Sequence, residues 1–254
     1  MGRPDQNDLS GARTELDASA LYREGKLTEA IASLNAEVRD HPTDVQRRTF
    51  LFELLCFDAN YERAAKQLDV LAQGDPEAMT GILSYHTVLA CETARQEMFQ
   101  SGSFPESKVA PRPVRGRLNG EPFERLEDAD PRIGARLELF LGGQYNWLPL
   151  EHLKSVRIET PKKLRDLLWV TASIEGGDAL DGADFGEALI PGLTPLAAQH
   201  PDDLVRLGRV TQWIDLDNDL QAPVGGKMLL VDDEEFPILE VRELEIEGPS
   251  TTSG

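Results

Sequence analysis

The residues with the clearest potential for chemistry are the aspartates of Asp215-Leu-Asp217-Asn-Asp219, a stretch that begins like a calcium-binding loop. An EF-hand loop needs glycine at its sixth position and a bidentate glutamate at its twelfth. This sequence has Leu220 and Gly226 at those two positions. A solvated acidic turn is therefore the better interpretation, and we expect no bound calcium.

Two glycine pairs also fall short of a binding motif. Gly176-Gly177, followed by aspartates at 178, 181 and 184, resembles a calcium-binding glycine–aspartate repeat, but such sites need stacked copies and this one occurs once. Gly225-Gly226-Lys227 lacks the upstream glycine and the following serine or threonine of a phosphate-binding loop. We interpret the first pair as part of a mobile acidic loop and expect no nucleotide cofactor.

The histidines and cysteines show no catalytic or metal-binding spacing. None of the four histidines has a second ligand at a zinc spacing. Cys56 and Cys91 lie in apolar helical patterns, which predicts buried free thiols. The sequence thus predicts no metal, no cofactor and no enzymatic activity. An enzyme whose acid and base meet only in the fold is the alternative, and it would need a cleft with converging carboxylates or histidines of shifted pKa.

The composition is that of a globular protein without a membrane segment. Of 254 residues, 40% are hydrophobic and 28% are charged. The chain has no apolar run of about 18 residues, and its first residues lack the basic and apolar regions of a signal peptide. We therefore expect a cytoplasmic protein with no membrane as partner.

The net charge of −19 is concentrated in the last third of the chain. From Glu175 onward, 18 acidic residues stand against four basic residues. Nucleic-acid binding requires clusters of lysine and arginine, so this charge excludes a nucleic acid as partner. The small basic group of Lys108, Arg112, Arg115 and Arg117 is interpreted as a solvated loop.

The element around which the first half is organised is a predicted helix at residues 44–57, DVQRRTFLFELLCF. Its apolar residues lie on nearly every face, which indicates a helix covered from several sides. Thr43, three residues ahead of Gln46, has the spacing of a capping box. Leu51, Leu54 and Leu55 share one face and are expected in the core.

The helices on either side of residues 44–57 repeat with a period of 34. The matched pairs are Leu27 and Tyr61, Ala30 and Ala64, Leu34 and Leu68, and Pro42 and Pro76. This period is that of the tetratricopeptide repeat. One departure is Phe52, which replaces the small Ala18 of the first repeat and predicts looser or differently angled packing. A third repeat is absent because Arg95 and Met98 occupy the positions of a large apolar and a small residue.

A longer helix at about 77–99 is therefore expected to cap the two repeats. Because such arrays need about three repeats to be stable alone, the helical part should lean on the C-terminal half. That half changes to a strand pattern. Runs at 137–141 and 144–148 flank Gly142-Gly143 as a hairpin, and runs at 228–231 and 238–241 flank a four-residue acidic turn. Further short strands are predicted at 156–158, 167–170, 188–190 and 209–214.

The predicted fold class is α+β, in two domains. Residues 10–101 form a tetratricopeptide-like helical domain of two repeats plus a capping helix, and residues 102–120 form a linker or long loop. Residues 121–246 form a smaller strand-rich α+β domain with a twisted sheet or partly open barrel, and 247–254 form a disordered tail. Trp147, Trp169 and Trp213 are expected to pack this second domain, with an interface as the alternative role for one of them.

Several motifs resemble one known family. Residues 44–57, with Tyr61-Glu-Arg-Ala and Gln67-Leu-Asp-Val-Leu, are similar to the ImpE/TagJ family of bacterial type VI secretion accessory proteins. The second half agrees through these motifs: Asn119-Gly-Glu-Pro-Phe, Asp128-Ala-Asp-Pro-Arg-Ile-Gly, Asn146-Trp-Leu-Pro, Leu164-Arg-Asp-Leu-Leu-Trp, Ala188-Leu-Ile-Pro and Arg209-Val-Thr-Gln-Trp. The resemblance covers about residues 10–215, and the segment beyond Asp215 is longer than is usual for the family.

This resemblance implies a non-enzymatic, cytoplasmic adaptor. Family members bind the small subunit of the contractile sheath through its N-terminal helix, and they are linked to the AAA+ ATPase that recycles the contracted sheath. The resemblance assigns no individual contact residue. The alternative is a tetratricopeptide scaffold for an unrelated, basic partner, whose binding would weaken steeply with salt.

The repeat geometry nominates the contact residues instead. The first helix of each pair lines the concave face of such an array, and a partner helix would lie in that groove. The candidate partner-binding residues are Leu16, Ser19, Tyr22, Gln46, Thr49, Phe50 and Glu53. The same residues would otherwise be ordinary core and solvated surface.

Overall fold

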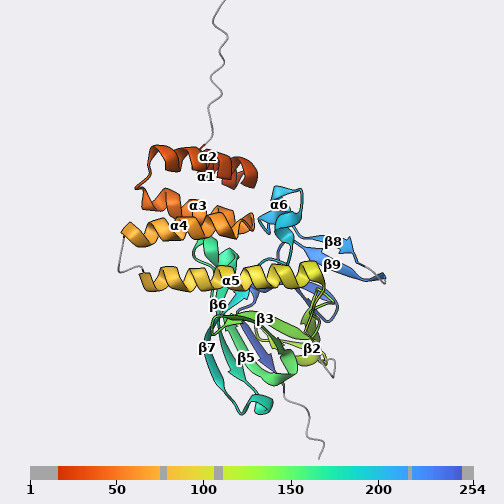
Figure 1. Ribbon diagram of the computed structural model, residues 1–254. Helices are drawn as coiled ribbons and strands as arrows, with labels where there is room; N and C mark the ends of the chain where they lie inside the picture. The colour runs from red at the N-terminus through yellow and green to blue at the C-terminus, as the bar shows by residue number, and fades with distance from the viewer. Residues whose placement is uncertain (1–16, 75–78, 106–110, 217–218, 248–254) are drawn as a thin grey trace, which may run out of the picture.

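Five helices stack in chain order in the first half of the protein (Figure 1). The computed structural model describes residues 17–74, 79–105, 111–216 and 219–247. The helices are α1 (Ala18–Arg23), α2 (Leu27–Asp40), α3 (Val45–Phe57), α4 (Tyr61–Gly74) and α5 (Met79–Ser101). Helices α2 and α4 have equal lengths of 14 residues and begin 34 residues apart, as the sequence offset requires.

Helix α3 lies at the centre of this stack. All seven residues from Leu51 to Phe57 are buried, which agrees with a helix that is apolar on every face. The predicted capping box was wrong. The N-cap is Asp44, whose carboxylate accepts a hydrogen bond from the Arg47 backbone N–H at 2.9 Å. Asp44 therefore takes the N-cap role that was predicted for Thr43. Its carboxylate also forms an ion pair with the Arg47 side chain.

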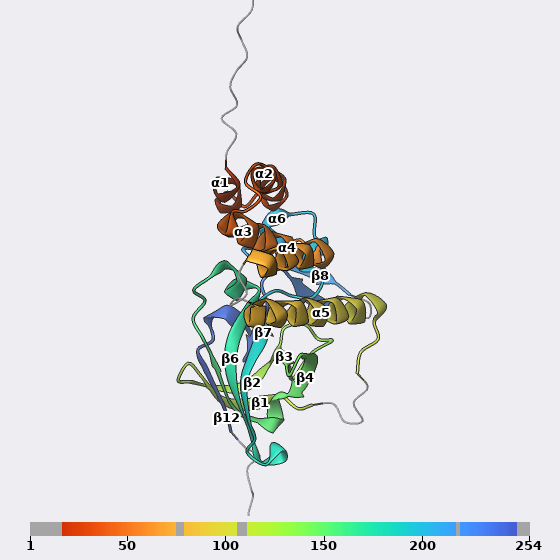
Figure 2. The same cartoon turned by 60° about the vertical axis from the view of Figure 1, so that its left-hand side comes forward.

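The second half is built on a ten-stranded, fully antiparallel sheet that curls around its own core without closing (Figure 2). Its order is β11-β10-β2-β1-β12-β5-β6-β7-β3-β4. The strands are β1 (Val114–Leu118), β2 (Glu121–Asp128), β3 (Arg136–Leu141), β4 (Gln144–Pro149), β5 (Leu153–Ile158), β6 (Trp169–Gly176), β7 (Asp184–Pro191), β10 (Met228–Val231), β11 (Glu234–Pro237) and β12 (Glu243–Ile246). A separate ribbon pairs β8 (Gln212–Asp215) with β9 (Gln221–Val224).

The structure confirms one predicted hairpin and corrects the other. Strands β3 and β4 pair across Gly142-Gly143, both of which have positive φ, as a two-residue turn requires. In the second hairpin the turn is only Asp232-Asp233, with φ of 52° and 70°. The four-residue acidic turn was therefore wrong, because Glu234 and Glu235 belong to β11 and pair with β10.

The predicted domain boundary also shifts. Strand β1 lies inside the segment 102–120 that was expected to be a linker, and it occupies the middle of the sheet between β2 and β12. Its alternation of buried apolar and exposed polar residues is short and interrupted by Gly116, which weakened the strand signal. The strand-rich half was predicted to be the smaller domain, but it is the longer of the two even without β1.

A short helix, α6 (Asp203–Arg206), joins the C-terminal half to the ends of the helices. The Asp203 carboxylate accepts a hydrogen bond from the Thr28 backbone N–H at 2.9 Å, and so caps α2, whose own N-cap has no side-chain bond. Arg206 pairs with Asp58 at the end of α3. Arg209 donates to two backbone carbonyls at the end of α1. These three contacts hold α1, α2 and α3 against the C-terminal half, as was expected for an array of only two helical repeats.

Helix α5 lies between the two halves and packs on β4 and on α4 (Figure 1). The described part of the chain contains no helix with both the length and the apolar character needed to cross a membrane.

Candidate partner-binding surface

The structure brings together two of the predicted contact residues, Tyr22 on α1 and Phe50 on α3. Their rings meet edge to face with centroids 5.9 Å apart, and both side chains are half-buried. The Arg209 guanidinium lies 4.6 Å from the centroid of the Tyr22 ring. One side of Tyr22 is thus already occupied by the C-terminal half of the same chain.

Glu53 also faces the C-terminal half of its own chain. It is 8% exposed, and its carboxylate lies 3.7 Å from Arg165 in the 3-10 helix η3 (Leu164–Leu167). Arg165 in turn lies over the Tyr85 ring of α5 at 5.2 Å. Burial raises the pKa of Glu53 to about 6, because the distant Arg165 compensates only part of the lost hydration.

Replacing Glu53 by glutamine is expected to make the protein more stable at neutral pH. The pKa of Glu53 is about 6 in the folded protein, above its ordinary value of 4.5, so the folded state favours the protonated carboxyl. Any stability that depends on this proton is present below pH 4.5 and is lost as pH rises through 6, where the buried carboxylate becomes charged. The Glu53→Gln variant should gain about 2 kcal/mol of unfolding free energy at pH 8 and almost nothing at about pH 3.5. Urea unfolding at the two pH values measures this difference. An equal effect at both values would contradict the raised pKa.

Two of the remaining predicted contact residues are more accessible. Ser19 on α1 and Gln46 on α3 are exposed, and Thr49 is half-buried. Leu16 lies outside the described residues. The surface open to a partner is therefore the edge formed by Ser19, Gln46 and Thr49 beside the Tyr22–Phe50 ring pair, which we call the groove edge. Local sequence pattern could not predict that Arg165 would close its other side over Tyr85, because both residues are distant in the chain from α1 and α3.

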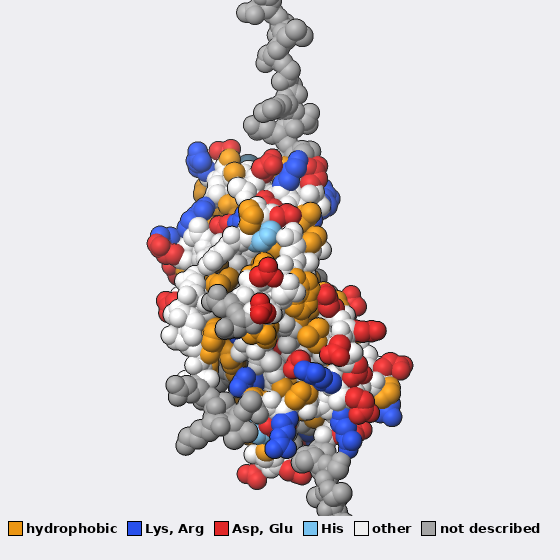
Figure 3. Space-filling model, turned by 90° about the vertical axis from the view of Figure 1, so that its right-hand side faces the viewer, with side chains coloured by type: hydrophobic (Ala, Val, Ile, Leu, Met, Phe, Trp, Pro, Cys, Tyr) orange, Lys and Arg blue, Asp and Glu red, His pale blue; other side chains and the backbone are white. Residues whose placement is uncertain are grey.

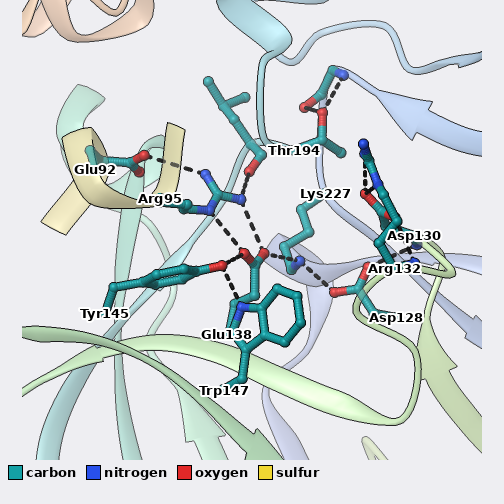
Figure 4. Close-up of polar contacts among 12 residues, drawn as sticks. Glu92, Arg95, Asp128, Asp130, Arg132, Glu138, Tyr145, Trp147, Thr194 and Lys227 are labelled. Atoms are coloured by element: carbon teal, nitrogen blue, oxygen red, sulfur yellow. Dashed lines mark hydrogen bonds and ion pairs between the residues drawn. The ribbon is translucent and has the colours of Figure 1, made fainter. Parts of the chain in front are cut away.

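Between α5 and the sheet lies a buried network of charged side chains that the sequence did not predict (Figure 4). Arg95 of α5 donates two hydrogen bonds to the Glu138 carboxylate of β3, at 2.9 and 3.0 Å. It also pairs with Glu92 at 3.4 Å, and Glu92 accepts a bond from the Trp169 indole at 2.9 Å. These contacts connect α5 to β3 and to β6, the two strands that flank β7 in the sheet.

Lys227 extends the network to the opposite side of Glu138. Its ammonium lies 2.5 Å from the Glu138 carboxylate and also pairs with Asp128 at the end of β2. Tyr145 donates its hydroxyl to Glu138, and the Trp147 indole donates to the Tyr145 oxygen. Glu138 is fully buried, and each of its carboxylate oxygens accepts from at least two donors.

The pKa values follow from this geometry. Burial alone would raise the pKa of Glu138, but the adjacent charges of Arg95 and Lys227 outweigh it and hold that pKa well below its usual range. Burial raises the pKa of Asp128 to about 6, although Lys227 opposes the shift. Two carboxylates with displaced pKa values are what the enzyme alternative required.

The network is nevertheless closed to any substrate. Arg95, Glu138 and Lys227 are at most 2% exposed. The adjoining cavity, lined by Glu92, Arg95 and Thr194 among others, has a volume of about 20 Å³, which holds about one water molecule. A fully buried, hydrogen-bonded set of ion pairs specifies how two layers fit together. We therefore assign it to the docking of the two halves.

A larger hollow of about 660 Å³ lies at one end of the sheet. Its lining mixes Arg112 and Lys154 with Glu124, Glu151 and Asp178, without a cluster of one charge. The described residues hold no group of three or more His, Cys, Asp or Glu arranged to bind a metal ion. Part of the aspartate-rich stretch considered for calcium, residues 217–218, lies outside them.

The comparisons with known proteins agree with the sequence motifs. The ImpE protein family matches residues 120–245. The type VI secretion system accessory component TagJ of Pseudomonas aeruginosa is 32% identical, with 91% of each chain covered. The crystal structure of protein VPA1032 from Vibrio parahaemolyticus has the same fold, with a TM-score of 0.79 at 21% identity, covering 92% of this chain and 98% of that one. The chain therefore belongs to the ImpE/TagJ family of type VI secretion system accessory proteins.

Proposed function

We propose that this protein is a non-enzymatic, cytoplasmic adaptor whose helical half is a pair of tetratricopeptide repeats. In this proposal the groove edge binds the N-terminal helix of the small contractile-sheath subunit, and the adaptor assists the AAA+ ATPase that recycles the sheath. The observation that carries the proposal is 32% identity to a type VI accessory component over 91% of the chain.

The geometry of the groove edge supports this role. Tyr22 and Phe50 present a half-buried aromatic pair, and aromatic side chains of this kind are common anchors for a partner helix. Exposed polar groups of Ser19 and Gln46 lie on the same two helices and would form the polar rim.

The test is to block the groove edge without disturbing the fold. The double variant Ser19→Arg/Gln46→Arg adds bulk and charge at two exposed positions, and we expect it to weaken binding of the purified sheath subunit at least about tenfold. The matched control is Ala36→Arg, an exposed small residue on α2, which should bind normally. Tyr22→Ala and Glu53→Ala are less suitable, since both side chains contact the C-terminal half.

Isothermal titration with the sheath subunit and with a peptide of its N-terminal helix measures the effect. Unchanged binding by a folded double variant would remove the groove edge from the proposal. A scaffold for a basic partner is the second candidate, favoured by the acidic C-terminal third. Its binding would fall steeply between 50 and 500 mM salt, at roughly the range over which exposed charges become screened, whereas apolar helix docking would change little.

A further inference from the structure

The solvent-facing side of α5 carries no charged residue over most of its length. Between positions 79 and 96, the exposed residues are Met79, Thr80, Gly81, Leu83, Ser84, Thr87, Ala90, Thr93 and Ala94. The acidic and basic residues of this stretch, Glu92 and Arg95, are buried in the network between the two halves. Other parts of the surface are densely charged, as Figure 3 shows for the carboxylates gathered along the lower right flank of that view. An uncharged helix face of this length on a protein with a net charge of −19 indicates an interaction site.

The exposed side chains of this face form one continuous surface. At about 100° per residue, Met79, Leu83, Ala90 and Ala94 fall within a sector of about 60° around the helix, and we call these four residues the α5 ridge. A hollow of about 590 Å³ lies along one side of the ridge, between α4 and α5, and Ala90 belongs to its lining. A second hollow of about 440 Å³ lies along the other side, between α5 and strands β3 and β7, and Thr87 belongs to its lining. The ridge is therefore raised between two depressions that another helix could fill.

The position of α5 in the helical stack explains why this face is uncovered. Helix α5 begins 34 residues after α3, so it stands where the first helix of a third pair would begin. The next element along the described chain is β1, so no second helix covers α5 as α4 covers α3. Phe52 and Cys56 of α3 are 1% and 3% exposed, whereas the residues 34 positions later, His86 and Ala90, are half-buried and exposed. The outer helix of such a stack normally carries a polar face, and α5 instead has the composition of a covered one.

The α5 ridge is self-complementary about a two-fold axis. Its first half carries two large residues, Met79 and Leu83, which are 43% and 59% exposed, and its second half carries the small residues Ala90 and Ala94. Positions 79 and 94, like positions 83 and 90, are equally far from a point just before Thr87. A second α5 that runs antiparallel across this point would place each Leu83 against Ala90 of the other copy and each Met79 against Ala94. Alanine lets two helix axes approach to about 8 Å, so the large residues would enter the hollows beside the ridge.

We propose that two copies of this protein associate through the α5 ridge, with the two helices antiparallel about a two-fold axis beside Thr87. A second copy fits this face better than any charged part of the surface, because two chains with a net charge of −19 repel one another wherever carboxylates meet. The carboxylates that line the two hollows, Asp58, Glu62 and Glu187, belong to other elements than α5. One helix face per copy is at the small end of specific interfaces, about 1,200 Å² in total, so we expect a dissociation constant of about 1–50 µM. The ridge is separate from the groove edge and does not depend on the proposed function.

The first experiment measures association of the full-length protein by sedimentation equilibrium. Between about 1 and 200 µM, the protein should change from monomer to dimer, and added salt should not weaken the dimer because screening reduces the repulsion between the two acidic chains. A protein that remains monomeric over this range would overturn the proposal. So would a dimer that dissociates between about 50 and 500 mM salt, since it would be held together by charge pairs.

The second experiment locates the interface by placing a charge on the ridge. Leu83→Arg should raise the dissociation constant at least about tenfold, because it sets a hydrated charge against Ala90 of the other copy. Leu83 is 59% exposed in the single chain, so the substitution should leave the fold intact. The matched control Val45→Arg changes a residue of α3 that is 60% exposed, and this variant should dimerise normally. Equal effects of the two substitutions would overturn the assignment of the interface to α5.

The third experiment tests the two-fold pairing itself. Leu83→Ala removes the large partner and Ala90→Leu sets two leucines against each other, so each substitution alone should weaken the dimer at least about tenfold. The double variant Leu83→Ala/Ala90→Leu again pairs a large residue with a small one, so it should recover to within about threefold of the unmodified protein. A double variant as weak as the two single effects combined would overturn the antiparallel arrangement.

The sheath contact is separated from the dimer by exchanging the variants between the two assays. Ser19→Arg/Gln46→Arg should dimerise normally, and Leu83→Arg should bind the purified sheath subunit normally, so that either proposal can fail alone. Loss of sheath binding by Leu83→Arg, in a protein that stays monomeric, would make a helix of the sheath subunit the occupant of the ridge and would overturn the dimer.

Discussion

Replacing Arg95 by methionine is expected to lower the free energy of unfolding by about 3–5 kcal/mol, the loss typical of removing one partner from a buried ion pair. Arg95 is 1% exposed and supplies the only direct link between Glu92 and Glu138 among the described contacts. Without it, Glu138 and Asp128 would share the single positive charge of Lys227, and Glu92 would lose its ion pair and keep the hydrogen bond from the Trp169 indole. For a chain of this length, the melting temperature should fall by about 6–20 °C.

The deficit of Arg95→Met should be smaller at pH 5 than at pH 8. Loss of the guanidinium raises the pKa of the remaining buried carboxylates, so their protonation at low pH restores part of the stability. Urea unfolding at both pH values measures the two deficits. The matched control is Arg157→Met, which breaks an exposed pair with Glu243 and should cost less than about 1 kcal/mol. Equal losses for the two variants would show that the network does not hold the halves together.

Replacing Phe52 by alanine is expected to cost about 3–5 kcal/mol, the range for deleting a buried aromatic ring. Phe52 is 1% exposed, and its ring lies edge to face with Tyr85 of α5 at 5.6 Å. Tyr85 in turn lies 6.4 Å from Trp169 of β6. The large residue at a position expected to be small is thus the first of three rings that run from α3 to the sheet.

The control for Phe52→Ala is Phe50→Ala, two residues away on the same helix. Phe50 is only half-buried, so its truncation leaves a smaller cavity and should cost about half as much. Calorimetry of the two variants gives the comparison. If Phe50→Ala were the more damaging, the core of the helical half would be centred on the groove edge and not on the contact with α5.

Features of the fold that depend on neighbouring residues were predictable. The 34-residue offset located α2 and α4, and Gly142-Gly143 located the β3–β4 hairpin, because helix breaks and two-residue turns are encoded locally. Burial of every residue from Leu51 to Phe57 followed from the lack of a polar face. The change from helical to strand periodicity along the sequence also predicted the α+β class, with helices followed by strands.

Features that depend on distant partners were not predictable. Arg95 stands out in the sequence only because it breaks a possible third repeat, and nothing local links it to Glu138, which lies 43 residues away in the first strand of the predicted hairpin. The groove prediction treated Glu53 as free, whereas η3 covers it with Arg165. Strand β1 was overlooked because its neighbours in the sheet include β12, at the opposite end of the chain.

The α6 contacts have a consequence for synthesis of the protein on the ribosome. The carboxylate that caps α2 belongs to Asp203, 175 residues after Thr28. At the usual bacterial range of about 5–20 residues per second, that carboxylate is made about 9–35 s after the helix it completes. The helical half must therefore wait with an unfinished α2 end until the last third of the chain emerges. A chain truncated before α6 should consequently be a substrate for chaperones and proteases, although every helix of its first half is present.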